Sequence, residues 1–153
     1  MVSLPEALRP HARIGLDTSV FIYQIEAETP FTTIAGDVLG HVARGSVQGV
    51  TSVLTLTELL VKPFQSGRSG LAVRYEALIR ATPNLEIVDI NTQIARQAAL
   101  LRATYQLRTA DALQIASSLE YGATAFVTND LRLRRVDALT IIVLADYHDE
   151  RSL

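Results

Sequence analysis

Residues 107–130, LRTADALQIASSLEYGATAFVTND, contain the pattern that decides the fold. The stretch predicts a helix capped by Thr109, a glycine turn and a short buried strand over Ala125–Thr128. A carboxylate stands at each end of this unit, because Asp111 lies in the first helical turn and Asp130 lies just past the strand. We therefore expect the helix and the strand to bring two acids to the same edge of the fold.

The rest of the chain repeats this alternation of helices with short apolar strands. We expect further strands at 13–18, 49–54, 85–90 and 139–144. We expect further helices at 20–28, 31–44, 55–63, 71–81 and 92–105, and a flexible loop at 65–70. Continuous apolar strands between helices are typical of a parallel sheet that is covered on both faces. The prediction is an α/β fold, a three-layer α/β/α sandwich with a mostly parallel central sheet.

Length and composition restrict the class of protein. The 153 residues suit one domain, which we place at residues 1–153 with its core at about 13–145. The chain is 48% hydrophobic and 20% charged, so it is globular rather than disordered. No apolar run approaches the roughly 18–20 residues of a membrane span, and no signal-like segment opens the chain. We expect a cytoplasmic protein without a membrane partner.

The chain has no cysteine and a formal net charge of −2. The first fact excludes disulfides, zinc–thiolate sites and a cysteine nucleophile. The slightly negative net charge argues against a protein that binds nucleic acid over its whole surface, but it allows a local basic rim around an acidic centre.

Two earlier acids occupy positions equivalent to those of Asp111 and Asp130. Asp17 ends the first predicted strand, and Glu58 lies in the first turn of the helix that follows the second strand. In open α/β sheets, ligands bind beyond the carboxyl ends of the strands, where the strand order reverses. The chain has 16 acidic residues in all, so the position of these four carries the signal rather than their number.

Each of the four acids also has a purely structural interpretation. Glu58 completes a capping-box pattern with Thr55, Asp111 suits the helix dipole, and Asp130 can cap the turn that follows it. Asp17 can bond the amides of a local turn. It nevertheless ends a strongly apolar strand, where a solitary carboxylate is costly unless it has a partner.

Together, the four acids predict a metal site. Carboxylates that lie within a few ångströms raise one another's pKa, and a divalent cation removes that repulsion. Oxygen ligands without His or Cys favour Mg²⁺ or Mn²⁺. The three histidines show no metal-ligand spacing. The predicted catalytic and metal-binding residues are Asp17, Glu58, Asp111 and Asp130.

Four segments of the chain resemble one family, the PIN-domain ribonucleases, and in particular the VapC-like toxins of type II toxin–antitoxin pairs. The segments are IGLDTSVFIY (14–23), TLTELLVKP (55–63), RTADALQIASSLEYGA (108–123) and FVTND (126–130). The resemblance implies the α/β/α fold and cleavage of RNA that depends on Mg²⁺ or Mn²⁺. It implies that Asp17, Glu58 and Asp111 are the main metal ligands. Asp130 would be a fourth acid, bound directly or through water.

The resemblance also implies the partners and the supporting residues. The chain would be an endoribonuclease, a hydrolase in which a water activated at the metal attacks the phosphorus in line and leaves a 5′-phosphate and a 3′-hydroxyl. Its partners would be an RNA substrate, a cognate antitoxin whose peptide enters a groove near the acids, and a second copy in a homodimer. The supporting hydroxyls would be those of Thr18, Ser19 and Thr128. Candidate phosphate contacts are Lys62, Arg68, Arg108 and Arg132, with Arg134 and Arg135. The alternative is that all of these are ordinary surface residues.

Three other functions compete with that of a ribonuclease toxin. A PIN-like nuclease can act in RNA processing or on structured DNA. A non-catalytic protein- or RNA-binding module can share the fold, although the presence of all four acids counts against it. A phospho-acceptor receiver domain needs a lysine late in the chain, and Lys62 is the only lysine.

Overall fold

The computed structural model of the protein describes residues 2–148. Its centre is a sheet of five strands in the order β3-β2-β1-β4-β5, and every neighbouring pair is parallel. The strands are β1 (Arg13–Leu16), β2 (Gln48–Ser52), β3 (Leu85–Val88), β4 (Ala125–Thr128) and β5 (Thr140–Val143). The expected parallel sheet is confirmed.

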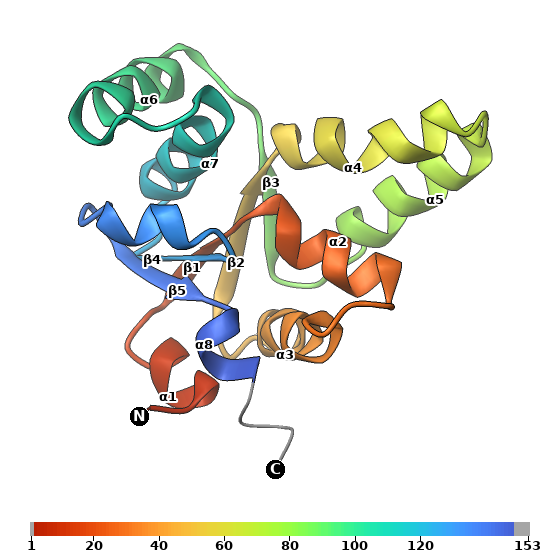
Figure 1. Cartoon of the computed structure of the whole chain (residues 1–153), viewed down its shortest axis with the longest axis horizontal. Helices are drawn as coiled ribbons and strands as arrows, with labels where there is room; N and C mark the ends of the chain where they lie inside the picture. The colour runs from red at the N-terminus through yellow and green to blue at the C-terminus, as the bar shows by residue number, and fades with distance from the viewer. Residues whose placement is uncertain (1, 149–153) are drawn as a thin grey trace.

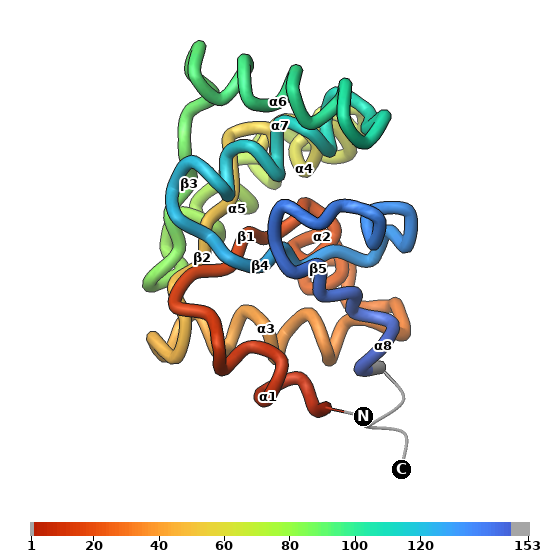
Figure 2. The backbone as a smooth tube through the Cα atoms, turned by 90° about the vertical axis from the view of Figure 1, so that its left-hand side faces the viewer, coloured from red at the N-terminus to blue at the C-terminus, as the bar shows by residue number. Residues whose placement is uncertain are grey.

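Helices cover both faces of this sheet, as Figures 1 and 2 show from two directions. Helices α6 and α7 lie on one face, and α1, α2 and α3 lie on the other, with α4 and α5 beside α2. The bounds are α1 (Leu4–Leu8), α2 (Thr18–Glu26), α3 (Thr32–Ala43), α4 (Val53–Gln65), α5 (Ser69–Arg80), α6 (Thr92–Tyr105), α7 (Thr109–Glu120), the 3₁₀ helix η1 (Leu131–Arg135) and α8 (Ala145–His148). The predicted α/β/α sandwich is therefore confirmed. Within residues 2–148, no helix has the length and apolar character needed to cross a membrane.

Two hydrophobic cores lie on either side of the sheet, because successive strand residues point to opposite faces. Ile14 and Leu16 of β1 belong to the core under α2 and α3. Gly15 between them faces α7, where an added Cβ would lie 2.0 Å from the Ser118 Oγ atom. The absence of a side chain at Gly15 lets α7 pack directly on β1, and this contact places the N-terminus of α7 near the end of that strand.

The predicted bounds of helix α4 and of the loop that follows it were wrong. Helix α4 begins at Val53 rather than Thr55, because the Ser52 hydroxyl accepts the Leu54 amide and caps the helix. The helix also continues past Pro63 to Gln65, and α5 begins at Ser69, so half of the loop expected at 65–70 is helical. The break between α4 and α5 is short and includes Gly67 at a φ of 68°. Helix α8 includes Asp146, and residues 149–153 lie outside the described part of the chain.

Candidate functional site

The candidate site lies at the carboxyl ends of β1 and β4, where the order of the strands reverses. The chain runs from β1 outward through β2 to β3, and then crosses back to β4 on the other side of β1. Asp17 follows β1 directly, and Asp130 lies two residues past the end of β4. The Thr128 hydroxyl donates to Asp17 Oδ2 at 2.7 Å and accepts the Asp130 amide at 3.1 Å. Thr128, predicted to support the site, therefore joins the two strand ends.

Asp17 is a partly buried carboxylate at the N-terminus of α2. Its Oδ1 atom accepts the Thr18 amide at 2.9 Å, which confirms the expected local turn. Burial raises the pKa of Asp17 to about 6, and the negative charges of Asp111 and Glu58 act in the same direction, whereas the bond from Thr128 opposes the rise. The protein thus holds an acid whose ionised form is unfavourable without a positive partner.

Glu58 lies in the second turn of α4, not in its first turn as predicted. The proposed capping box with Thr55 is wrong, because Ser52 caps this helix three residues earlier. Glu58 instead accepts the Thr18 hydroxyl at its Oε1 atom, at 2.7 Å. The partner of Glu58 is therefore a residue next to Asp17 and far away in sequence, which draws α4 toward the end of β1.

Asp111 lies in the first turn of α7, as predicted, and its side chain is 22% exposed. The N-cap position belongs to Arg108, so the expectation that Thr109 caps this helix is wrong. Burial raises the pKa of Asp111, the neighbouring Arg108 lowers it, and the charges of Asp130 and Glu58 raise it again. Asp111 is therefore electrostatically coupled to other acids of the site.

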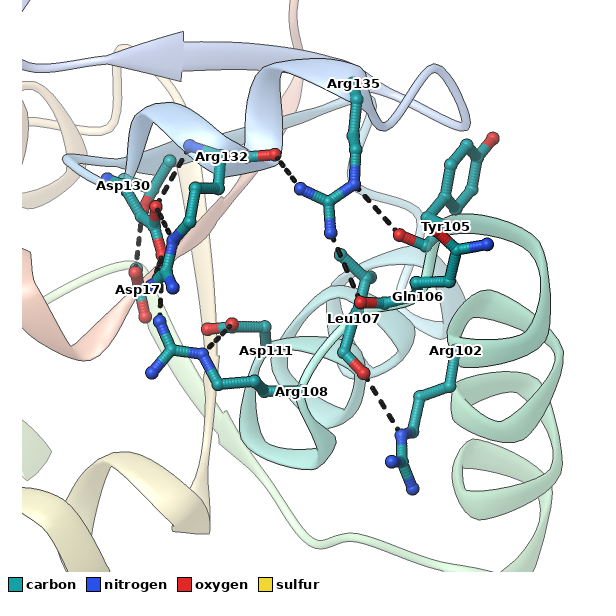
Figure 3. Close-up of polar contacts among 11 residues, drawn as sticks. Asp17, Arg102, Tyr105, Gln106, Leu107, Arg108, Asp111, Asp130, Arg132 and Arg135 are labelled. Atoms are coloured by element: carbon teal, nitrogen blue, oxygen red, sulfur yellow. Dashed lines mark hydrogen bonds and ion pairs between the residues drawn. The ribbon is translucent and has the colours of Figure 1, made fainter.

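Asp130 caps the 3₁₀ helix η1, so its structural interpretation is confirmed. Its Oδ1 atom accepts the Arg132 amide at 3.0 Å and the Arg132 Nε at 3.0 Å, and its Oδ2 atom lies 2.7 Å from Arg132 Nη2. Arg108 reaches both acids, with its Nε 3.7 Å from Asp111 Oδ2 and its Nη2 3.7 Å from Asp130 Oδ2. Figure 3 shows the two arginines pointing into the group of acids. They supply the positive charge that the carboxylates need in this arrangement.

The four acids are thus brought to one edge of the sheet, and their charges influence one another. Among residues 2–148, however, no three carboxylate or histidine side chains lie close enough together to enclose a metal ion as they stand. The donor set still fits Mg²⁺ or Mn²⁺, since it consists of carboxylate oxygens and includes a partly buried acid with a raised pKa. Ser19, the third predicted hydroxyl, has a buried Oγ atom without a hydrogen-bond partner in the described part of the chain.

The predicted phosphate contacts form two groups on opposite sides of the acids. Arg108 and Arg132 lie on the α7 and η1 side, where they bind Asp111 and Asp130. Lys62 and Arg68 line a groove of about 260 Å³ that also contacts Glu58. Lys62 pairs there with Glu26 at 3.0 Å.

Arg134 and Arg135 contribute to the structure instead. Arg134 pairs with Asp146 at 2.6 Å. Arg135 donates to the backbone carbonyls of Tyr105, Gln106 and Arg132 (Figure 3), which joins η1 to the end of α6.

Sequence reasoning missed Gln114, a residue of α7 that is 2% exposed. Its amide donates to Thr18 at 3.1 Å and to Thr55 at 2.8 Å, so it contacts the hydroxyl that binds Glu58. The only signal in the sequence was a polar residue one turn after Asp111, on the buried face of the helix. This signal does not predict which residues Gln114 binds.

Comparisons with known proteins agree with this fold. The fold matches a chain of the VapBC2 complex of Rickettsia felis bound to a promoter DNA fragment, with a TM-score of 0.67, 19% identity, and coverage of 84% of this chain and 96% of that chain. It also matches a chain of the DNA-bound VapBC of Salmonella typhimurium, with a TM-score of 0.62, 22% identity, and coverage of 86% and 98%. A chain of a toxin–antitoxin complex of Klebsiella pneumoniae matches with a TM-score of 0.61, 16% identity, and coverage of 86% and 97%.

A search of curated proteins returned no match. The sequence model of the PIN domain matches residues 14–139, a span that contains all four acids of the site. Because this match covers most of the chain, the protein belongs to the PIN-domain family.

Proposed function

We propose that the protein is a Mg²⁺- or Mn²⁺-dependent endoribonuclease and the toxin of a toxin–antitoxin pair. The observation that supports this most is Asp17, a partly buried acid with a pKa of about 6 that is coupled to Asp111 and Glu58 at the switch point of a PIN-domain sheet. A protein gains nothing in stability from such a group, which favours a role in binding a cation.

Under this proposal, Asp17, Glu58 and Asp111 hold the metal, and Asp130 assists directly or through water. The metal, when bound, stabilises negative charge on the phosphate and lowers the pKa of the attacking water. Thr128 orients Asp17, and Thr18 orients Glu58. A carboxylate of the site would accept the proton of that water.

RNA is the proposed substrate, and the arginines beside the acids are suited to bind its phosphates. Arg108 and Arg132 are 65% and 60% exposed, and each already faces the carboxylates. If a cation bound those carboxylates in place of the arginines, the two guanidinium groups would be available to bind substrate phosphates. Lys62 and Arg68 would bind the chain on the other side of the acids.

Metal replacement tests the proposed activity. Purified protein with Mg²⁺ or Mn²⁺ should cleave single-stranded RNA and leave 5′-phosphate and 3′-hydroxyl ends. Excess EDTA, or Ca²⁺ in place of Mg²⁺, should reduce the rate by at least about 100-fold. Without a cation the carboxylates supply no positive charge to the transition state, and Ca²⁺ takes longer and more flexible coordination than Mg²⁺. Undiminished cleavage in EDTA would contradict the proposal, and a preference for structured DNA would favour the alternative nuclease role.

An apolar groove next to the acids supports the antitoxin partner. The cavity beside Glu58 shares Ile25 and Tyr75 with a second cavity of about 620 Å³ between α2, α3 and α5. Among the apolar residues, Ile22 and Leu59 line the first cavity, and Phe21 lines the second. Similar folds occur in solved toxin–antitoxin complexes. We therefore place an antitoxin segment in this groove. The homodimer and the cytoplasmic location remain predictions.

Leu78→Glu should weaken neutralisation by the antitoxin without reducing cleavage. Leu78 is 61% exposed and lines the larger cavity, so a charge there opposes an apolar peptide and leaves the fold intact. The measurement is growth of cells that express the variant together with the product of a small neighbouring gene. Leu100→Glu on α6 is the control, since Leu100 is 67% exposed and does not line the groove. Equal neutralisation of both variants would contradict this placement, and the absence of any neutralising gene product would favour a processing nuclease over a toxin.

A further inference from the structure

A buried polar network connects α7 to the acidic site through Gln114. The network joins three segments that are distant in sequence, namely the start of α2, the junction of β2 with α4, and the middle of α7. Its members are Thr18, Thr51, Ser52, Thr55 and Gln114, and each is at most 3% exposed. It ends at the carboxylate of Glu58.

The direction of each hydrogen bond at the threonines follows from counting hydrogens, since a hydroxyl has only one to donate. Thr51 donates to the Leu16 carbonyl at 2.9 Å. Thr55 must therefore be the donor in its 2.7 Å contact with Thr51. Thr18 donates to Glu58 at 2.7 Å. The hydrogens of Thr18 and Thr55 are thus both used, and each oxygen can only accept from a further partner.

These constraints also fix the orientation of the Gln114 amide. Its nitrogen must face the two threonine oxygens, to which it donates at 3.1 Å for Thr18 and 2.8 Å for Thr55. Its oxygen then accepts the Ser52 hydroxyl at 2.7 Å. In the flipped orientation, the amide oxygen would face two threonine oxygens with no hydrogen to offer. Gln114 therefore uses both of its amide hydrogens, and a hydroxyl or an apolar side chain cannot replace it.

We propose that Gln114 is a positioning residue of the acidic site, which holds the Thr18 hydroxyl so that its hydrogen points to Glu58. The consequence for metal binding rests on the proposed function, but the hydrogen-bond arrangement does not. Without the amide, the Thr18 oxygen loses its donor in a buried setting, and other rotamers become accessible to it. Glu58 then loses the contact that holds its carboxylate beside Asp17.

The test is a mutant cycle of Gln114→Met, Thr18→Val and the double variant, with Gln114→Glu as a second substitution of the same size. The first measurement is the Thr18 side-chain rotamer, from three-bond couplings to its methyl carbon in the metal-free, isotope-labelled protein. Wild type should show one rotamer, and both Gln114 variants should show averaging. The second measurement is Mn²⁺ affinity by calorimetry, which should fall about tenfold in Gln114→Met, at the lower end of the loss seen when groups behind metal ligands are removed.

The double variant decides whether Gln114 acts through Thr18. If it does, Gln114→Met should change Mn²⁺ affinity by less than about twofold when Thr18 is already valine. Ser117→Ala is the matched control, because Ser117 is fully buried on the same helix and its hydroxyl binds the Leu113 carbonyl of that helix. It should leave the Thr18 rotamer and Mn²⁺ affinity unchanged.

Three results would overturn the inference: a single Thr18 rotamer in Gln114→Met, an unchanged Mn²⁺ affinity in that variant, or an equal loss with and without Thr18. A wild-type protein that neither binds Mn²⁺ nor cleaves RNA would instead refute the proposed function, and the rotamer measurement would then decide the inference alone. If Gln114→Met fails to fold, Gln114→Glu carries the same rotamer test.

Discussion

Asp17→Asn is expected to abolish cleavage and, at the same time, to stabilise the metal-free protein by about 1–3 kcal/mol at pH 8. The rise of the Asp17 pKa from 3.8 to about 6 corresponds to about 3 kcal/mol of unfavourable free energy for the ionised side chain in the folded state. Asparagine removes that charge and keeps an oxygen for the Thr18 amide, but it fits the hydroxyl of Thr128 less well. Activity and stability should therefore change in opposite directions.

The pH dependence of this effect has a definite sign. Because the pKa of Asp17 is higher in the folded than in the unfolded state, the folded protein binds the proton more tightly between pH 3.8 and about 6. The penalty from Asp17 is absent below that window, grows as the pH rises through it, and is constant above it. The stability difference between Asp17→Asn and wild type should follow the same course.

Urea unfolding in EDTA at several pH values between 4 and 8 measures this difference, and an RNA cleavage assay with Mg²⁺ measures activity. Asp89→Asn is the control, because Asp89 is exposed and lies outside the site. It should change the free energy of unfolding by less than about 0.5 kcal/mol. Unchanged cleavage by Asp17→Asn would refute the assignment of the site, and a loss of stability at pH 8 would show that Asp17 supports the metal-free fold.

Local patterns in the sequence predicted the parts of the fold that depend on neighbouring residues. The strand at Ala125–Thr128 and the helix at Thr92–Tyr105 have the predicted bounds, since their apolar spacing and flanking residues are sufficient to define them. Asp17 stood out for a similar reason, because a charge at the end of an apolar strand needs a partner wherever the strand lies. The parallel sheet follows from the alternation of such elements.

Interactions between distant residues account for what the sequence did not reveal. Glu58 matched a local capping pattern with Thr55, but its partner is Thr18, 40 residues away. The predicted cap of α4 was Thr55, but in the folded structure Ser52 takes this role. Gln114 binds Ser52, which lies 62 positions away in sequence, and Thr18, which lies 96 positions away. No short segment of the sequence therefore contains both Gln114 and its partners.

Gly15→Ala is expected to destabilise the protein by about 3 kcal/mol or more and to reduce cleavage at least in proportion to the unfolded fraction. The added Cβ would lie 2.0 Å from Ser118 Oγ, 2.6 Å from Ser118 Cβ and 2.8 Å from Phe126 Cδ1. Neither neighbour can move away easily, because both are buried between the sheet and α7. The strain should shift α7, and with it Asp111, away from the end of β1.

A second substitution separates this steric cause from other effects of alanine. Ser118→Gly removes both of the closest atoms, so the double variant Gly15→Ala/Ser118→Gly should recover part of the stability, even though glycine itself costs about 1 kcal/mol inside a helix. Gly70→Ala is the matched control, because an added Cβ there meets no atom within 4 Å, and it should stabilise α5 by about 0.5–1 kcal/mol. Chemical unfolding of wild type, Gly15→Ala, Gly15→Ala/Ser118→Gly and Gly70→Ala measures these differences in the free energy of unfolding. If Gly15→Ala is as stable as wild type, or if Ser118→Gly gives no recovery, the direct packing of α7 on β1 does not set the position of Asp111.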